Sequence, residues 1–115
     1  MHELSVTENI LEIAVRHGQN AGAARITNLY LVIGQLSSII DDSVQFYWDI
    51  ISKDTLAENA QLHFRRIPTQ LRCLECNREF TPVKEDFACP ECGSIRVKVS
   101  AGEEFFLEAI DIEKT

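Results

Sequence analysis

Hydrophobic residues in the first third of the chain recur at helical spacing and then at strand spacing. In residues 4–17 apolar side chains return every three or four positions, which predicts an amphipathic helix. Gly18 is expected to end this helix, with Arg16 and His17 beside the negative end of its dipole. Residues 26–34 are apolar on both faces, which is typical of a strand in the centre of a sheet.

The middle of the chain repeats this alternation of helix and strand. A second helix is expected through residues 44–53. Its apolar face would carry Val44, Trp48 and Ile51, and its candidate N-terminal caps are Asp41, Asp42 and Ser43. The aromatic run 46–48 is expected in the core. Residues 60–67 then alternate as a strand should, with Leu62 and Phe64 on one face and His63 and Arg65 on the other.

Pro68 interrupts the pattern, and strand character returns at 95–99 and 104–112. The predicted fold class is therefore α+β: a small mixed β-sheet with two helices on one face, plus a zinc-ribbon-like lobe. We expect residues 1–69 and 94–115 to form the body and residues 70–93 to form the lobe.

All the cysteines lie in that lobe, at the spacing C-x2-C-x12-C-x2-C: Cys73, Cys76, Cys89 and Cys92. Two tight C-x-x-C turns can aim four thiolates at one ion, so the spacing predicts a tetrahedral metal site. Zinc is the expected metal, iron in a rubredoxin-like site is the chemical rival, and disulfides or free thiols are the less favoured alternative. Four sulfur ligands leave no open position for a substrate, which indicates a structural role.

The lobe has little apolar content of its own. Phe80 and Phe87 are expected to cover the cysteine turns, and Gly93 would supply a positive φ after the second pair. Metal binding, worth about 10–16 kcal/mol in zinc-finger peptides, would supply most of the stability of such a lobe.

Composition and charge narrow the function. The chain of 115 residues has a formal net charge of −7, which argues against a nucleic-acid partner held through phosphates. No apolar run approaches the roughly 20 residues that cross a bilayer, and the N-terminus lacks the features of a secretory signal, so we expect a cytoplasmic protein. Neither a Ser-His-Asp or Cys-His order nor a glycine-rich phosphate loop is evident, and no enzymatic activity is expected. His17 and His63 are interpreted as a helix-end and a surface residue.

The N-terminus carries a second candidate metal site. The α-amine of Met1, the backbone nitrogen of His2 and the His2 imidazole are adjacent and can close fused chelate rings. The backbone nitrogen or the carboxylate of Glu3 is the nearest candidate for a fourth donor. Nitrogen-rich square-planar coordination selects Ni(II) or Cu(II) over zinc.

An MHE start combined with the C-x2-C-x12-CPxCG ribbon resembles the HypA/HybF family of nickel-incorporation proteins, over essentially the whole chain. The resemblance implies a metallochaperone that delivers Ni²⁺ during [NiFe]-hydrogenase maturation, together with the GTPase HypB and the hydrogenase large-subunit precursor. It also implies nickel at Met1, His2 and Glu3, and structural Zn²⁺ at Cys73, Cys76, Cys89 and Cys92. The protein would act as a monomer or homodimer, and some members of the family also serve urease.

Two other classes of function are compatible with the pattern. A zinc-ribbon protein-interaction module without nickel transfer would keep the cysteines but would not depend on His2. A small redox protein would hold iron at the cysteines and show a visible spectrum.

Overall fold

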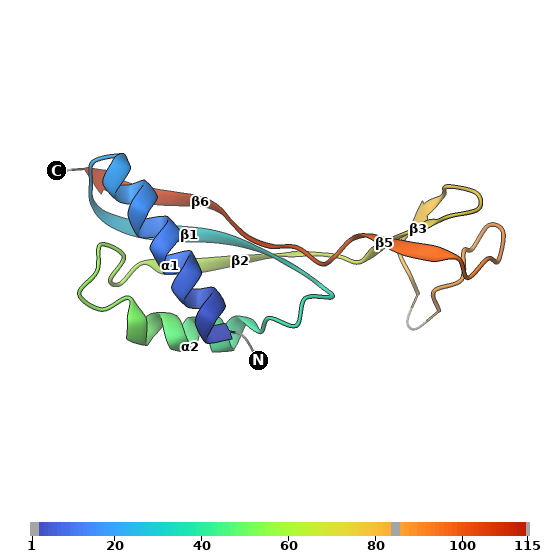
Figure 1. The fold of residues 1–115 in the computed structure, drawn as a ribbon, viewed down its shortest axis with the longest axis horizontal. Coiled ribbons are helices and arrows are strands. Elements are labelled where there is room, and N and C mark those ends of the chain that lie inside the picture. Colours follow the sequence, from blue (N-terminus) through green and yellow to red (C-terminus); the bar gives the residue numbers. More distant parts are fainter. Residues whose placement is uncertain (1–2, 84–85, 115) are drawn as a thin grey trace. The chain divides into compact units, whose positions relative to one another are not determined.

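The computed structural model describes residues 3–83 and 86–114. Its helices and strands form two compact units, one of residues 1–32, 38–65 and 105–115 and the other of residues 33–37 and 66–104. Figure 1 shows the elements along the chain: α1 (Glu3–Asn20), β1 (Ala23–Gly34), α2 (Asp41–Ile51), β2 (Gln61–Ile67), β3 (Gln70–Cys73), β4 (Glu79–Phe80), β5 (Val97–Ala101) and β6 (Phe105–Lys114). The predicted α+β class is confirmed, with two three-stranded sheets where one was expected.

The first unit packs α1 and α2 on one face of a sheet with strand order β2-β1-β6. The central position predicted for residues 26–34 is confirmed, because β1 lies between the other two strands. Its core takes side chains from both helices, from the strands and from the segments between them: Ile10, Ala14, Ile26, Leu29, Leu31, Ile39, Val44, Trp48, Ala57, Ala60 and Leu62. None of the described helices is long and apolar enough to cross a membrane.

The prediction that Gly18 ends the first helix is wrong. Helix α1 continues to Asn20, and Gly22, with φ +75°, follows it instead. Gly18 lies inside the helix and is buried, and a Cβ there would approach the side chains of Ile26 and Leu56 to 3.1 Å. Gly18 therefore allows the helix to pack closely, a reason that local sequence does not reveal.

Helix α2 also departs from two expectations. Its N-cap is Ile40, without a side-chain cap, so Asp41 and Asp42 lie in the first turn and act on the helix dipole instead. Val44 and Trp48 are buried as predicted, but Phe46 is 61% exposed. The run 46–48 therefore contributes Trp48 to the core and presents Phe46 to solvent.

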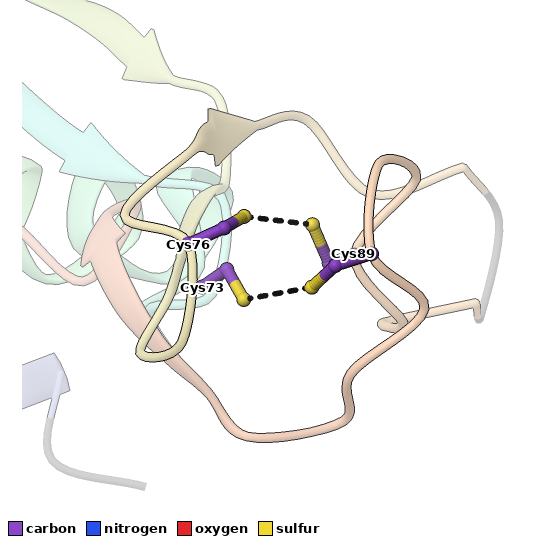
Figure 2. Close-up of side chains that lie close together, drawn as sticks. Cys73, Cys76 and Cys89 are labelled. Carbon is purple, nitrogen blue, oxygen red and sulfur yellow. Dashed lines mark hydrogen bonds between the residues drawn. The ribbon is translucent and has the colours of Figure 1, made fainter.

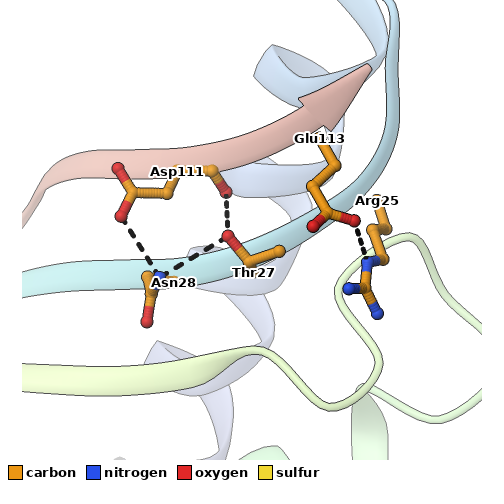
Figure 3. Close-up of polar contacts among 5 residues, drawn as sticks. All are labelled: Arg25, Thr27, Asn28, Asp111 and Glu113. Atoms are coloured by element: carbon orange, nitrogen blue, oxygen red, sulfur yellow. Dashed lines mark hydrogen bonds and ion pairs between the residues drawn. The ribbon is translucent and has the colours of Figure 1, made fainter. Parts of the chain in front are cut away.

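The sheet face opposite the helices carries a polar network (Figure 3). Asp111 on β6 accepts a hydrogen bond from the Asn28 amide at 3.2 Å, which Figure 3 shows. It also accepts one from the Tyr30 hydroxyl at 2.6 Å. His63 on β2 lies 2.8 Å from the Asn28 oxygen and stacks on Tyr30 with ring centroids 4.8 Å apart. The outward orientation predicted for His63 is explained by these contacts across three strands.

The second unit holds the other sheet, in the order β4-β3-β5. Strand β3 pairs antiparallel with both neighbours, and the partner of Cys73 on β5 is Val97. A small apolar cluster, made by Leu71, Cys73, Phe80 and Cys89 with Val97 and Val99 beside it, lies against this sheet. The cysteine residues are thus part of the core of this unit.

Candidate metal centre

Two loops of the second unit carry the cysteines. The first follows β3, which ends at Cys73, and includes Cys76; the second, with Cys89 and Cys92, precedes β5. Because β3 pairs with both β4 and β5, the sheet brings the bases of the two loops together. Figure 2 shows their side chains converging on one point.

The two loops repeat the same backbone hydrogen bonds. The N–H of Cys73 donates to the carbonyl of Arg78 at 2.9 Å, and that of Cys89 donates to Ser94, five residues on, at 2.9 Å. Four residues after each leading cysteine, Asn77 donates back to Cys73 at 3.0 Å and Gly93 to Cys89 at 2.8 Å. Each loop is therefore the same tight turn, built twice.

A residue in the left-handed backbone conformation completes each turn. Gly93 has φ +74°, as the sequence predicted, and Asn77 occupies the equivalent position after the first pair with φ +63°. Asparagine tolerates this conformation better than most side chains do. The role of Asn77 was not predicted, although its place directly after the first C-x-x-C was the available signal.

The sulfur positions fit a tetrahedral metal site. All four Sγ atoms lie within 4.8 Å of one another, with Cys73 and Cys92 at 3.5 Å and Cys76 and Cys89 at 3.6 Å. A disulfide needs about 2.05 Å, so the cysteines are free thiols. A tetrahedron with metal–sulfur bonds of about 2.3 Å has sulfur–sulfur edges of about 3.8 Å, close to the observed separations. The predicted cysteine constellation is present.

Backbone dipoles favour thiolate at the leading cysteine of each loop. The N–H of Cys76, followed by that of Glu75, lowers the pKa of Cys73. In the second loop the N–H of Cys92 lowers the pKa of Cys89 to about 7, against the opposing effect of burial. These amides therefore stabilise the thiolate form of the leading cysteines, which is the form that binds a metal.

The trailing cysteines behave in the opposite way. The N–H of Ser94 lowers the pKa of Cys92, but the neighbouring Cys73 sulfur, burial and the other two sulfurs together raise it to about 12. Four thiolates this close repel one another, so the set ionises fully only around a cation. The donor set therefore fits a soft divalent or trivalent metal.

Within each loop the leading and the trailing cysteine differ in exposure, in the same way in both loops. Cys73 and Cys89 are buried, and Cys76 and Cys92 are exposed. Phe80 covers the inner side as predicted, at 7% exposure, but the prediction that Phe87 does the same is wrong, because it is 49% exposed. One face of the sulfur cluster is therefore packed and the other faces solvent.

Ion pairs connect the loops outside the sulfur cluster. Arg78 contacts Glu91 at 2.9 Å, and Arg96 contacts Glu75 at 3.5 Å. Each glutamate directly precedes the second cysteine of one C-x-x-C pair, and its arginine partner follows the other C-x-x-C pair in the sequence. Exposed pairs of this kind contribute little to stability.

The predicted nickel ligands are described only in part. Met1 and His2 lie outside the described residues. Glu3 opens α1 and is 7% exposed, and the pKa of its carboxyl is lowered by the positive charge of the N-terminus, by the backbone N–H of Glu3 and, least, by that of Ile40 just before α2. The structure thus places the third residue of the predicted site against the entry to the second helix.

Comparison with known proteins identifies relatives over the whole chain. A family model described as "Hydrogenase/urease nickel incorporation, metallochaperone, hypA" matches residues 1–112. A hydrogenase maturation factor HypA from Dehalococcoides mccartyi is 41% identical over 113 residues, covering 98% of this chain and 95% of that protein. Another from Caldanaerobacter subterraneus is 37% identical over 98% of this chain and 100% of its own length.

Two solved structures share the fold. The solution structure of the Ni metallochaperone HypA from Helicobacter pylori aligns over 100% of both chains with a TM-score of 0.71 at 22% identity. A second structure, titled as the solution structure of HypA protein, aligns with a TM-score of 0.78 at 24% identity, over 97% of this chain and 96% of that one. The fold of this chain is therefore one already observed in solution.

Proposed function

The chain belongs to the HypA family, and we propose that it is a nickel metallochaperone that delivers Ni(II) during [NiFe]-hydrogenase maturation. The observation that carries the proposal is the family match over residues 1–112, which spans both the N-terminus and the cysteine loops. The named relatives at 37–41% identity are hydrogenase maturation factors.

The proposed resident metal is Zn²⁺, held by Cys73, Cys76, Cys89 and Cys92. Its chemistry in a closed four-sulfur site is structural, because no coordination position remains for exchange. The buried leading cysteines and the amides aimed at them would hold the metal in place permanently. A site built in this way does not suit a cargo metal that must be released.

The proposed cargo site is the N-terminus, with Met1, His2 and Glu3 as ligands. The adjacent amine, amide and imidazole nitrogens favour Ni(II) over Zn²⁺. The fourth donor would be the backbone nitrogen or the carboxylate of Glu3. A micromolar site corresponds to only about −8 kcal/mol, which allows transfer to an acceptor.

The proposed partners follow from this activity. A nickel donor for hydrogenase would act with the GTPase HypB and with the large-subunit precursor, in the cytoplasm, as a monomer or homodimer. We place the cargo metal on the first unit and the structural metal on the second.

Nickel titration into four forms of the full chain tests the proposal. These are the untagged parent, a form with two residues added before Met1, His2→Ala and Glu3→Gln. The extension converts the α-amine into an amide, and His2→Ala removes the imidazole, so both should abolish or greatly weaken nickel binding. Glu3→Gln should bind nickel nearly as the parent does if the backbone nitrogen of Glu3 is the donor, and more weakly if its carboxylate is.

Zinc content and thermal unfolding serve as the internal controls. Zinc content should stay unchanged in all four forms, because none of the changes touches the cysteine loops, and thermal unfolding should stay unchanged in the extended form and in His2→Ala. An extended protein that binds nickel as tightly as the parent would contradict the N-terminal site. A parent that binds nickel but forms no complex with purified HypB would restrict the failure to the proposed partner.

A further inference from the structure

An open groove lies in the first unit, and neither Glu3 nor any of the cysteines lines it. It runs between α1 and the end of α2 with the turn that follows, and its volume is about 660 Å³. Its lining residues are Glu8, Leu11, Glu12, Val15, Gln19, Ile51, Asp54, Thr55 and Leu56. Both helices and the following turn therefore contribute to it.

The floor of the groove is apolar. Leu11 and Val15 lie one turn apart on α1 and face Ile51 and Leu56 from the other side. Leu11 and Leu56 rest on the core below, and all four side chains are only partly buried. A floor of four half-buried aliphatic side chains can take further apolar groups without rearranging the core.

The rim of the groove is acidic. Glu8, Glu12 and Asp54 are exposed, and none of them forms an ion pair with another residue in the part of the chain that the structure describes. Glu8 and Glu12 are one helical turn apart, an arrangement of like charges that weakens the helix slightly. Arg16 and Lys53, the basic residues of these segments, do not line the groove.

We infer that this groove docks a cationic amphipathic helix of a partner protein. Apolar side chains one turn apart on that helix would fill the floor, and its lysines or arginines would pair with Glu8, Glu12 and Asp54. Charge complementarity selects this occupant. A second copy of the chain would bring a further net charge of −7, and nucleic acids and anionic membranes would be repelled.

The test uses a synthetic 16-residue peptide as the probe. It carries leucines at i, i+3, i+4 and i+7 spacing and lysines elsewhere, and a scrambled peptide of the same composition lacks the apolar face. Each is titrated into the ¹⁵N-labelled, zinc-loaded full chain at physiological salt. The amphipathic peptide should shift the amide signals of Leu11, Val15, Ile51 and Leu56, and the scrambled peptide should not.

Matched variants separate the groove from the overall charge. E8Q/E12Q and E79Q/E103Q both change the net charge from −7 to −5 (−7 + 2), and all four glutamates are exposed. Two exposed ion pairs lost at the rim should weaken binding about fivefold in E8Q/E12Q. Binding by E79Q/E103Q should remain that of the parent. Val15→Ser should weaken binding through the floor without changing any charge.

Three results would overturn the inference: signal shifts centred outside the groove, equal binding of the scrambled peptide, or equal weakening by the two double variants. Absence of any shift in the groove at millimolar peptide would overturn it as well. Nickel binding by the same variants is measured in parallel and should be unchanged. The groove can therefore fail while the nickel proposal stands.

Discussion

The two units of this chain differ in what holds them together. In the first, eleven buried residues from two helices, a sheet and the segments that join them form one hydrophobic cluster. In the second, the described cluster has only four buried members, and two of them are the cysteines Cys73 and Cys89. Apolar burial contributes roughly 25 cal/mol for each Å², so the first unit can be stable by packing alone. We therefore expect the second to depend on a metal bound to its sulfur atoms.

This difference explains why one protein would carry two metals in different ways. A metal that supports a fold cannot be given away without unfolding the part that it supports. A cargo metal must therefore bind to a part that is stable without it, and the first unit satisfies that condition. The proposed division of zinc and nickel between the units follows from their cores.

The largest expected effect breaks the second unit and spares the first. Cys73→Ser or Cys92→Ser should abolish stoichiometric zinc binding, because a metal worth about 10–16 kcal/mol in small zinc domains loses a ligand. Zinc is measured by elemental analysis, and the first unit is followed by the fluorescence of Trp48, the only tryptophan of the chain. The Trp48 denaturation midpoint should be that of the parent.

Ser100→Ala is the control variant, because Ser100 is exposed on β5 of the second unit and its substitution should leave zinc fully bound. Full zinc retention in Cys73→Ser would contradict the four-sulfur site. Loss of the native Trp48 signal together with zinc would show that the two units fold as one.

The reciprocal change weakens the first unit. Leu29 on β1 is fully buried, and Leu29→Ala should cost about 3 kcal/mol of that unit's stability because it leaves a cavity. The unfolding transition followed by Trp48 fluorescence should move to a lower denaturant concentration. Zinc release, measured with a chromogenic chelator, should occur at the same denaturant concentration as in the parent. A shift of both transitions by the same amount would contradict independent stability.

A smaller effect is expected from the turn residues of the cysteine loops. Gly93→Ala forces a side chain into a backbone with φ +74° and should cost about 1–2 kcal/mol, which is about 5- to 30-fold in zinc affinity. Asn77→Gly, at the equivalent position of the first loop, should leave zinc affinity equal or slightly higher. Chelator competition measures both. Equal zinc affinity in Gly93→Ala and the parent would show that the left-handed turn is not required.

Hydrophobic periodicity and motif spacing correctly predicted the features that depend on residues close together in the sequence. The central strand β1, the buried Val44 and Trp48 and the convergence of four cysteines all follow from periodicity or motif spacing. Each depends on residues near one another in the sequence, and so a single chain was sufficient to find it.

The incorrect predictions concern features that depend on contacts between residues far apart in the sequence. Gly18 was predicted to end α1, but its role depends on Ile26 and Leu56, which only the folded unit brings beside it. The exposed Phe46 belongs to a helix whose buried face is narrower than its run of aromatic residues. The pairing of β5 with β3 gives a second sheet, and hydrophobic alternation does not specify which strand pairs with which.

The smallest expected effect concerns the surface pair Arg25–Glu113, which joins β1 to β6 at 2.5 Å with both side chains more than half exposed (Figure 3). The hydrogen bond from Arg25 lowers the pKa of Glu113. A carboxyl whose folded pKa lies below its unfolded value of about 4.3 stabilises the fold above that pH, and the contribution disappears as pH falls through the folded pKa.

Arg25→Gln should therefore lower the Trp48 urea midpoint slightly at pH 7. The difference from the parent should shrink toward pH 3 and also in 1 M salt, because salt screens exposed charges. A difference that persists under both conditions would mean that Arg25 acts through the packing of its aliphatic stem, so that even this contact would belong to the apolar mode of stabilisation of the first unit.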